Sequence, residues 1–139
     1  MMLSPEQITQ FKAVCDALSD EHDTLKREVL SHCGNRWSLG VVYTLGTAGP
    51  LRHSELARAL PGVTQRMLTR TLRQLQADGL IDRHDHQQKY PRPRVDYHVT
   101  ELGKAMLLQM LPLWQWVVAN AGAFSEARQV YAAGSLASF

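Results

Sequence analysis

The chain has 139 residues, enough for one domain with a modest hydrophobic core and one long element left over for a partner. Its formal net charge is only +2, but the charges are unevenly distributed. Residues 36–94 hold ten Lys or Arg against four Asp or Glu, whereas residues 1–35 hold three basic against six acidic side chains. A basic middle between acidic ends indicates a polyanionic partner, and the alternative is a solvated basic surface without a ligand.

The sequence lacks several features that membrane proteins, secreted proteins and enzymes carry. No apolar run has the length that a bilayer requires, and the first residues lack a basic segment followed by an apolar one, so we expect a cytoplasmic protein without a membrane partner. Cys15 and Cys33 are expected to be reduced thiols. With no nucleophile–base–acid set, phosphate loop or paired carboxylates, the sequence predicts neither an enzyme nor a cofactor.

Three helices are predicted before residue 50. Ser4, Pro5 and Glu6 form a helix-start signal, and apolar residues at helical spacing predict a helix over residues 5–20. A second helical pattern runs to the break at residues 34–35. A third begins near residue 36 and ends in the segment 46–50.

Residues 51–80, LRHSELARALPGVTQRMLTRTLRQLQADGL, predict two short helices joined by a Pro-Gly turn. The first covers residues 54–60, after a very short strand at Leu51. Thr64 is a natural N-cap for the second, which keeps a 3.6-residue apolar period until the stop at residues 78–79. The face opposite the apolar residues is basic and polar, which is typical of a helix that enters the major groove of DNA.

The segments 80–83 and 95–99 change to a strand period and are joined by a polar tip that contains proline, which predicts a two-stranded wing. A long helix then begins at Thr100 and is apolar almost all round, with a kink expected at Pro112. One small domain offers too little cover for such a helix, so we expect a second copy of the chain to pack on it. The tail 125–139 is either a short further helix or partly disordered.

We predict DNA contacts from three places. Arginine can bind guanine, glutamine suits adenine, and threonine reaches phosphate or a thymine methyl group. An ordinary solvated helix face is the alternative for the second helix, and a structural role is the alternative for Arg94 at the start of a strand. Arg36 is a weaker candidate. The predicted DNA-binding residues are Arg52, Ser54, Thr64, Gln65, Arg66, Thr69, Arg70, Arg73, Lys89, Arg92 and Arg94.

A homodimer interface is predicted from the terminal helices. The predicted interface residues are Phe11, Leu18, Met106, Leu107, Met110, Leu113, Trp114 and Val117. Trp37 and Tyr97 are expected to be core or interface aromatics, and a small-molecule pocket lined by these two and by Trp114 and Trp116 is the alternative. An unidentified small-molecule effector is therefore a candidate partner.

Histidine and cysteine patterns give weaker signals. His84 and His86 flank an aspartate, but a closed zinc site needs four ligands, so no metal site is expected. Cys33 lies beside His32 and near the expected start of a helix, where a thiolate is favoured, which makes it a candidate redox sensor; burial is the alternative. Cys15 lies on an apolar helix face without an evident activator.

Three blocks of the sequence resemble one family. CGNRWSLGVVYTL, RHSELARALPGVTQRMLTRTLRQLQADGLIDR and PRVDYHVTELG are similar to consecutive blocks of the HxlR family of bacterial transcriptional regulators, over about residues 24–116. The resemblance implies a homodimeric DNA-binding regulator whose terminal helices form the dimer. The position where many members carry a sensing cysteine holds Thr24 here, and Asn35 and Arg36 replace a Gly and a Lys of the family pattern.

Together these patterns predict a mainly α (α+β) fold, a single winged helix-turn-helix domain over residues 1–139. Its parts are N-terminal helices over 5–35, a winged core over 36–99, a dimerisation helix over 100–124 and a tail over 125–139. We expect a sequence-specific transcriptional regulator that reads a pseudo-palindromic operator as a homodimer. The alternative is a winged-helix module that binds a protein or a small molecule without reading DNA.

Overall fold

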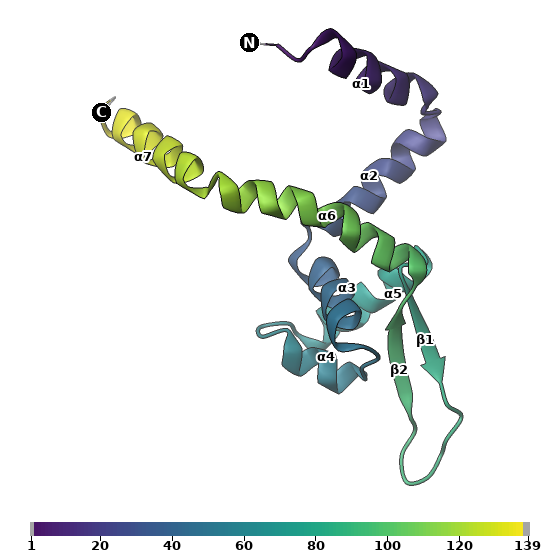
Figure 1. Ribbon diagram of the computed structural model, residues 1–139. Helices are drawn as coiled ribbons and strands as arrows, with labels where there is room; N and C mark the ends of the chain where they lie inside the picture. Colours follow the sequence, from purple (N-terminus) through teal and green to yellow (C-terminus); the bar gives the residue numbers. More distant parts are fainter. Residues whose placement is uncertain (1, 138–139) are drawn as a thin grey trace.

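The computed structural model describes residues 2–137 (Figure 1). This part of the chain folds into helices and one two-stranded antiparallel sheet, as the sequence predicts. Within it, no helix combines the length and the hydropathy that a membrane crossing needs. The elements are α1 (Pro5–Ala17), α2 (Asp20–Gly34), α3 (Arg36–Ala48), α4 (His53–Ala59), α5 (Gln65–Ala77), β1 (Ile81–Asp85), β2 (Val95–Val99), α6 (Glu101–Ala119) and α7 (Ala121–Ala137).

Polar side chains cap most helix starts. Ser4 and Thr64 accept hydrogen bonds from the backbone N–H groups of Gln7 and Met67, as the sequence predicts. The prediction of one helix over residues 5–20 is wrong at its end. Ser19 accepts a hydrogen bond from the N–H of His22 and so begins a new helix, α2, directly after α1.

The hydrophobic core lies between α3, α4, α5 and the start of β1. Helix α4 begins at His53, one residue earlier than predicted, and Gly62 makes the turn to α5 with a φ of 90°, which favours glycine. Trp37 and Tyr97 pack against this core, as expected. The buried apolar side chains are Val41, Val42, Leu45, Leu56, Leu60, Leu68, Leu72, Leu75, Leu80 and Ile81.

The wing consists of β1, β2 and the tip between them, over residues 81–99. The two strands pair from Ile81 with Val99 to Asp85 with Val95. Leu51 forms an isolated bridge with Tyr97, with hydrogen bonds in both directions, so the short strand predicted at Leu51 is present. This bridge attaches the segment before α4 to the middle of β2.

A single residue, Thr100, joins the wing to α6. Its N–H donates to the carbonyl of Leu80, its hydroxyl donates to the carbonyl of Gly79, and the same hydroxyl accepts from the N–H of Gly103. Gly103 is needed because a Cβ atom there would overlap the Leu80 carbonyl. Helix α6 continues past Pro112 to Ala119.

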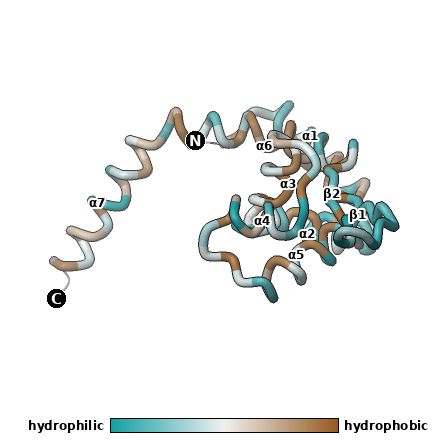
Figure 2. The backbone as a smooth tube through the Cα atoms, turned by 90° about the horizontal axis from the view of Figure 1, so that it is seen from below, coloured by the Kyte–Doolittle hydropathy of each residue, from teal (hydrophilic) through white to brown (hydrophobic). Residues whose placement is uncertain are grey.

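The terminal helices extend away from the core (Figure 1). Neither α1 nor α7 buries a described residue, and apolar residues recur along the isolated α7 (Figure 2). The predicted boundary at residue 124 is wrong, because α6 ends at Ala119 and α7 begins at Ala121. The tail is helical as far as Ala137, and its last residues, 138–139, lie outside the described residues.

Candidate nucleic-acid interface

Helix α5 carries an exposed polar face and a buried apolar face. Leu68, Thr71, Leu72 and Leu75 are buried, so the side predicted to face outward does so. A surface groove of about 700 Å³ follows this outward side. It is lined by Gln65, Arg66, Thr69, Arg70 and Arg73, all predicted as DNA-binding residues, and by Gln74, which was not.

A hydrogen bond joins the two helices of the helix-turn-helix at this face. The Nε2 atom of His53, at the start of α4, lies 3.2 Å from the hydroxyl of Thr69 on α5. The contact orients Thr69, so this predicted DNA-binding residue also has a structural partner. Sequence reasoning did not select His53, because its role depends on the angle between the two helices.

A second groove, of about 520 Å³, lies between α4 and the wing. Arg52 and Ser54 line it from the start of α4, and Arg92 and Arg94 line it from the wing, so four predicted residues come together here. Arg58 lines the same groove and was missed. Its place four residues after Ser54 puts both on one side of α4, a signal that was available in the sequence.

The arginines of both grooves are largely without acidic partners. Among residues 2–137, the only ion pair made by this set joins Arg94 Nε to Asp96 Oδ2 at 3.9 Å. Arg36 is different, because its guanidinium lies 4.8 Å from the centre of the Trp37 ring. Lys89 is exposed at the wing tip and lines neither groove. The uncompensated guanidinium groups give this surface a positive potential.

Asp96 and Glu55 are the acidic residues that line the second groove, and Asp96 is only 7% exposed. His86 and His98 each place Nε2 3.0 Å from one of its carboxylate oxygens. Burial raises the pKa of Asp96, but the hydrogen bonds from the two histidines outweigh it and hold that pKa below its usual value. Asp96 therefore stays ionised and holds its histidine neighbours in place.

A Ser–His–Asp arrangement, which the sequence did not indicate, lies away from both grooves. His32 Nε2 is 2.6 Å from Asp78 Oδ2, and His32 Nδ1 is 3.2 Å from the hydroxyl of Ser38. Ser38 is only 2% exposed, although it lines a groove of about 310 Å³ together with His32 and Asp78. The three side chains connect the end of α2, the start of α3 and the end of α5.

Cys33 lies in the last turn of α2 and not at the start of a helix, so the reason for expecting a favoured thiolate is wrong. It is half-buried, and burial raises the pKa of its thiol. The side chain lines an apolar groove of about 630 Å³ between α2 and α6, together with Val29, Leu80, Met106 and Met110. None of the four aromatic residues predicted to line a ligand pocket borders this groove.

The residues predicted at the dimer interface fall into two groups. Met106 and Leu107 pack partly against the core of their own chain, and Met110 is 9% exposed. Trp114 is half-buried against Tyr43, and Leu18 is also half-buried. Phe11, Leu113 and Val117 are exposed, as an interface in the dimer requires.

Known proteins share this sequence and this fold. Residues 32–124 match the family described as HxlR-like helix-turn-helix. An uncharacterised HTH-type transcriptional regulator of Methanothermobacter thermautotrophicus is 41% identical over 104 residues, which cover 73% of this chain and 76% of the relative.

Two solved structures show the same architecture. The candidate transcriptional regulator ytfH from Salmonella typhimurium gives a TM-score of 0.62 at 32% identity, covering 75% of this chain and 90% of that one. The redox regulator HypR in its reduced form gives 0.59 at 33% identity, covering 70% and 94%. With the winged helix-turn-helix and its basic grooves, these matches show that the chain belongs to the HxlR-like helix-turn-helix family of DNA-binding transcriptional regulators.

Proposed function

We propose that the protein reads a pseudo-palindromic DNA operator as a homodimer, with α5 of each copy in the major groove. The observation that carries this proposal is the set of arginines along the two grooves, which, apart from Arg94, form no ion pair within residues 2–137. An unneutralised basic surface on a protruding helix matches the phosphate charge and the groove width of DNA. This places the site of action in the cytoplasm, with the chromosome.

The two grooves have different tasks on the duplex. Gln65, Arg66 and Arg70 lie on the first part of α5, from which side chains reach base edges, and arginine can bind guanine with two hydrogen bonds. Arg52, Arg58 and the wing arginines contact phosphates or the minor groove beside it. The first set gives sequence preference, and the second gives affinity and register.

The terminal helices α1 and α7, which bury no described side chain in the hydrophobic core, support the homodimer. Helices α1 and α7 leave Phe11, Val14, Val130 and Tyr131 exposed, and a second copy is the simplest cover for them. A twofold dimer would present two α5 helices about 34 Å apart, one turn of DNA. This spacing explains why we expect a pseudo-palindromic site.

The groove between α2 and α6 is a candidate effector site. It is lined almost entirely by apolar side chains, and its volume of about 630 Å³ suits a small apolar molecule. An effector there would contact α6, which continues into the proposed dimer interface. Oxidation of Cys33 is the alternative signal, by analogy with the redox regulator HypR, but the raised pKa of this thiol favours the ligand.

The DNA proposal is tested by changing single arginines of α5. Arg66→Ala and Arg70→Ala should each weaken binding to the operator, identified by footprinting upstream of the gene, by about 1–3 kcal/mol. Fluorescence anisotropy measures the affinity, and circular dichroism and light scattering check that fold and assembly are unchanged. Arg27→Ala, on the exposed surface of α2 and outside both grooves, is the matched control and should bind DNA like the parent.

The salt dependence separates the proposal from its rival, a winged-helix module that binds only a protein or a small molecule. A DNA reader loses affinity steeply as salt rises, and the loss becomes shallower when a phosphate contact such as Arg52 is removed. If Arg66→Ala, Arg70→Ala and the parent bind all duplexes equally weakly, the reading-helix assignment is wrong and the rival is favoured.

A further inference from the structure

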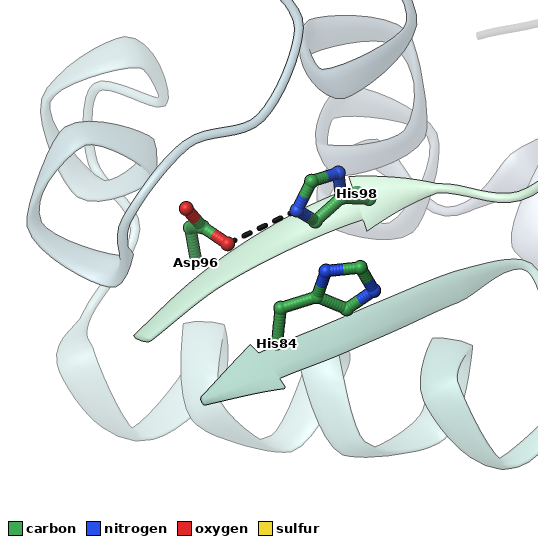
Figure 3. A group of neighbouring side chains, drawn as sticks. All are labelled: His84, Asp96 and His98. Carbon is green, nitrogen blue, oxygen red and sulfur yellow. Dashed lines mark hydrogen bonds and ion pairs between the residues drawn. The ribbon is translucent and has the colours of Figure 1, made fainter. Parts of the chain in front are cut away.

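The pairing of the wing strands brings one side chain of β1 beside two side chains of β2. His84 on β1 lies directly opposite Asp96 on β2, and His98 follows Asp96 by two residues. Opposite residues of an antiparallel pair, and residues two apart on one strand, share one face of the sheet. Figure 3 shows the three side chains on that common face.

The donor atoms of this cluster are close enough to share one ion. One ligand atom from each of His84, Asp96 and His98 lies within 4.8 Å of the other two. His98 Nε2 is 3.0 Å from Asp96 Oδ1, and the two imidazole rings have their centroids 4.0 Å apart (Figure 3). A cation between them would require the two stacked rings to turn their nitrogen atoms toward it and would replace the His98–Asp96 hydrogen bond.

The chemistry of the donors selects the kind of ion. Two imidazole nitrogens and one carboxylate oxygen are typical ligands of Zn²⁺ and of similar divalent transition metals. Three protein ligands leave a fourth position open to water. A hard ion such as Ca²⁺ or Mg²⁺ prefers an all-oxygen set, which this cluster does not offer.

The surroundings of Asp96 both support and oppose a cation. His86 Nε2 is 3.0 Å from the second carboxylate oxygen, Oδ2, and so fixes the orientation of the ligand. Arg94 lies 3.9 Å from the same oxygen and repels a cation, but its side chain is about half exposed (48%) and is free to turn toward solvent.

We propose that His84, Asp96 and His98 form a site for one divalent transition-metal ion of the Zn²⁺ type in the wing. The ion joins β1 to β2 by bonds that do not depend on the backbone ladder, and it adds two positive charges beside the groove that holds Arg92 and Arg94. The ion therefore stiffens the wing and increases its attraction for phosphate. This second effect rests on the proposed DNA-binding function, whereas the metal site itself does not.

The test is a metal titration of the full chain without a tag, in a Cys15→Ser, Cys33→Ser background that removes both thiols. Co²⁺ is followed by its visible absorption, and Zn²⁺ by competition with Co²⁺. We expect one ion per chain. His84→Ala and His98→Ala should each weaken binding by about tenfold or more. The matched control His22→Ala, on the exposed surface of α2, should bind like the parent.

Three results would overturn the site: no Co²⁺ binding at millimolar concentration, equal binding by parent and His84→Ala, or equal loss with His22→Ala. His84 is exposed, so its replacement keeps the fold intact, and circular dichroism checks His98→Ala. Operator binding is then measured with and without Zn²⁺. If the chain binds metal but no operator, the proposed function is wrong and the metal site stands. If His84→Ala and His98→Ala bind metal as tightly as the parent, the metal site is wrong and the proposed function stands.

Discussion

The winged core and the terminal helices differ in how their apolar residues are used. The core buries its apolar side chains between α3, α4, α5 and the wing, and Val41, Leu56 and Ile81 have no exposed surface. Helices α1 and α7 bury none of their described residues although they carry Phe11, Val14, Val130 and other large apolar side chains. The core is complete within one chain, whereas the terminal helices leave their apolar side chains exposed, which is the reason for proposing a dimer.

The boundary between these two regions runs through α6. Its first half packs Gly103 against the wing and Leu107 against the core and buries Met110, although Leu102 and Leu108 in the same half are exposed. Its second half exposes Leu113, Trp116 and Val117. One continuous helix therefore contributes to folding at one end and is available for assembly at the other.

Removing a core side chain should have the largest effect on stability. Leu45→Ala leaves a cavity in α3 and should lower the free energy of unfolding by about 2–5 kcal/mol. Leu136→Ala makes the same change on the exposed surface of α7 and should leave the unfolding of the core unchanged. Urea denaturation followed by circular dichroism measures both, and equal losses would remove the distinction between the two regions.

Charges introduced into the two halves of α6 should have different effects. Leu107→Glu with Met110→Glu places carboxylates against the core and should unfold the chain. Leu113→Glu with Val117→Glu places them on the exposed half and should give a folded monomer. Light scattering at micromolar concentration measures the mass, and circular dichroism reports the fold. A parent that is itself a monomer would refute the dimer.

The smallest effect concerns the two thiols. Because burial raises the pKa of Cys33, less of it is thiolate at neutral pH, so iodoacetamide should modify it more slowly than the exposed Cys15. In the dimer, α1 is expected to be covered, so Cys15 should react more slowly in the parent than in the monomeric Leu113→Glu, Val117→Glu variant. Mass spectrometry of the modified peptides gives both rates. Identical Cys15 rates in the two proteins would exclude α1 from the interface.

The parts that the sequence predicted correctly depend on local patterns. The outward face of α5 follows from a 3.6-residue period, and the start of that helix follows from Thr64, whose hydroxyl accepts from the N–H of Met67. The same logic failed at Ser19, because the polar run over residues 19–24 has no apolar period that would separate the end of α1 from the start of α2. Local sequence patterns therefore predict which face of a helix is buried better than they predict where the helix ends.

The parts that the sequence could not predict depend on tertiary geometry. An apolar helix such as α6 does not reveal which of its sides packs on its own chain, so the packing of Met106 and Leu107 against the core and the burial of Met110 could not be read from the sequence. The cluster of His84, Asp96 and His98 requires the pairing register of β1 and β2. His84 and His86 alone, read as neighbours in the sequence, gave no reason to expect a site.

Only one residue, Thr100, connects β2 to α6. Three hydrogen bonds hold it to Gly79, Leu80 and Gly103, so the strand and the helix cannot move independently. The wing must therefore follow any change in the tilt of α6. In a twofold dimer, the span between the two wing tips then depends on one angle, the crossing angle of α6 with its symmetry mate. In the proposed dimer, helix packing therefore sets the length of the binding site, and we expect an operator lengthened by a single base pair not to fit both wings at once.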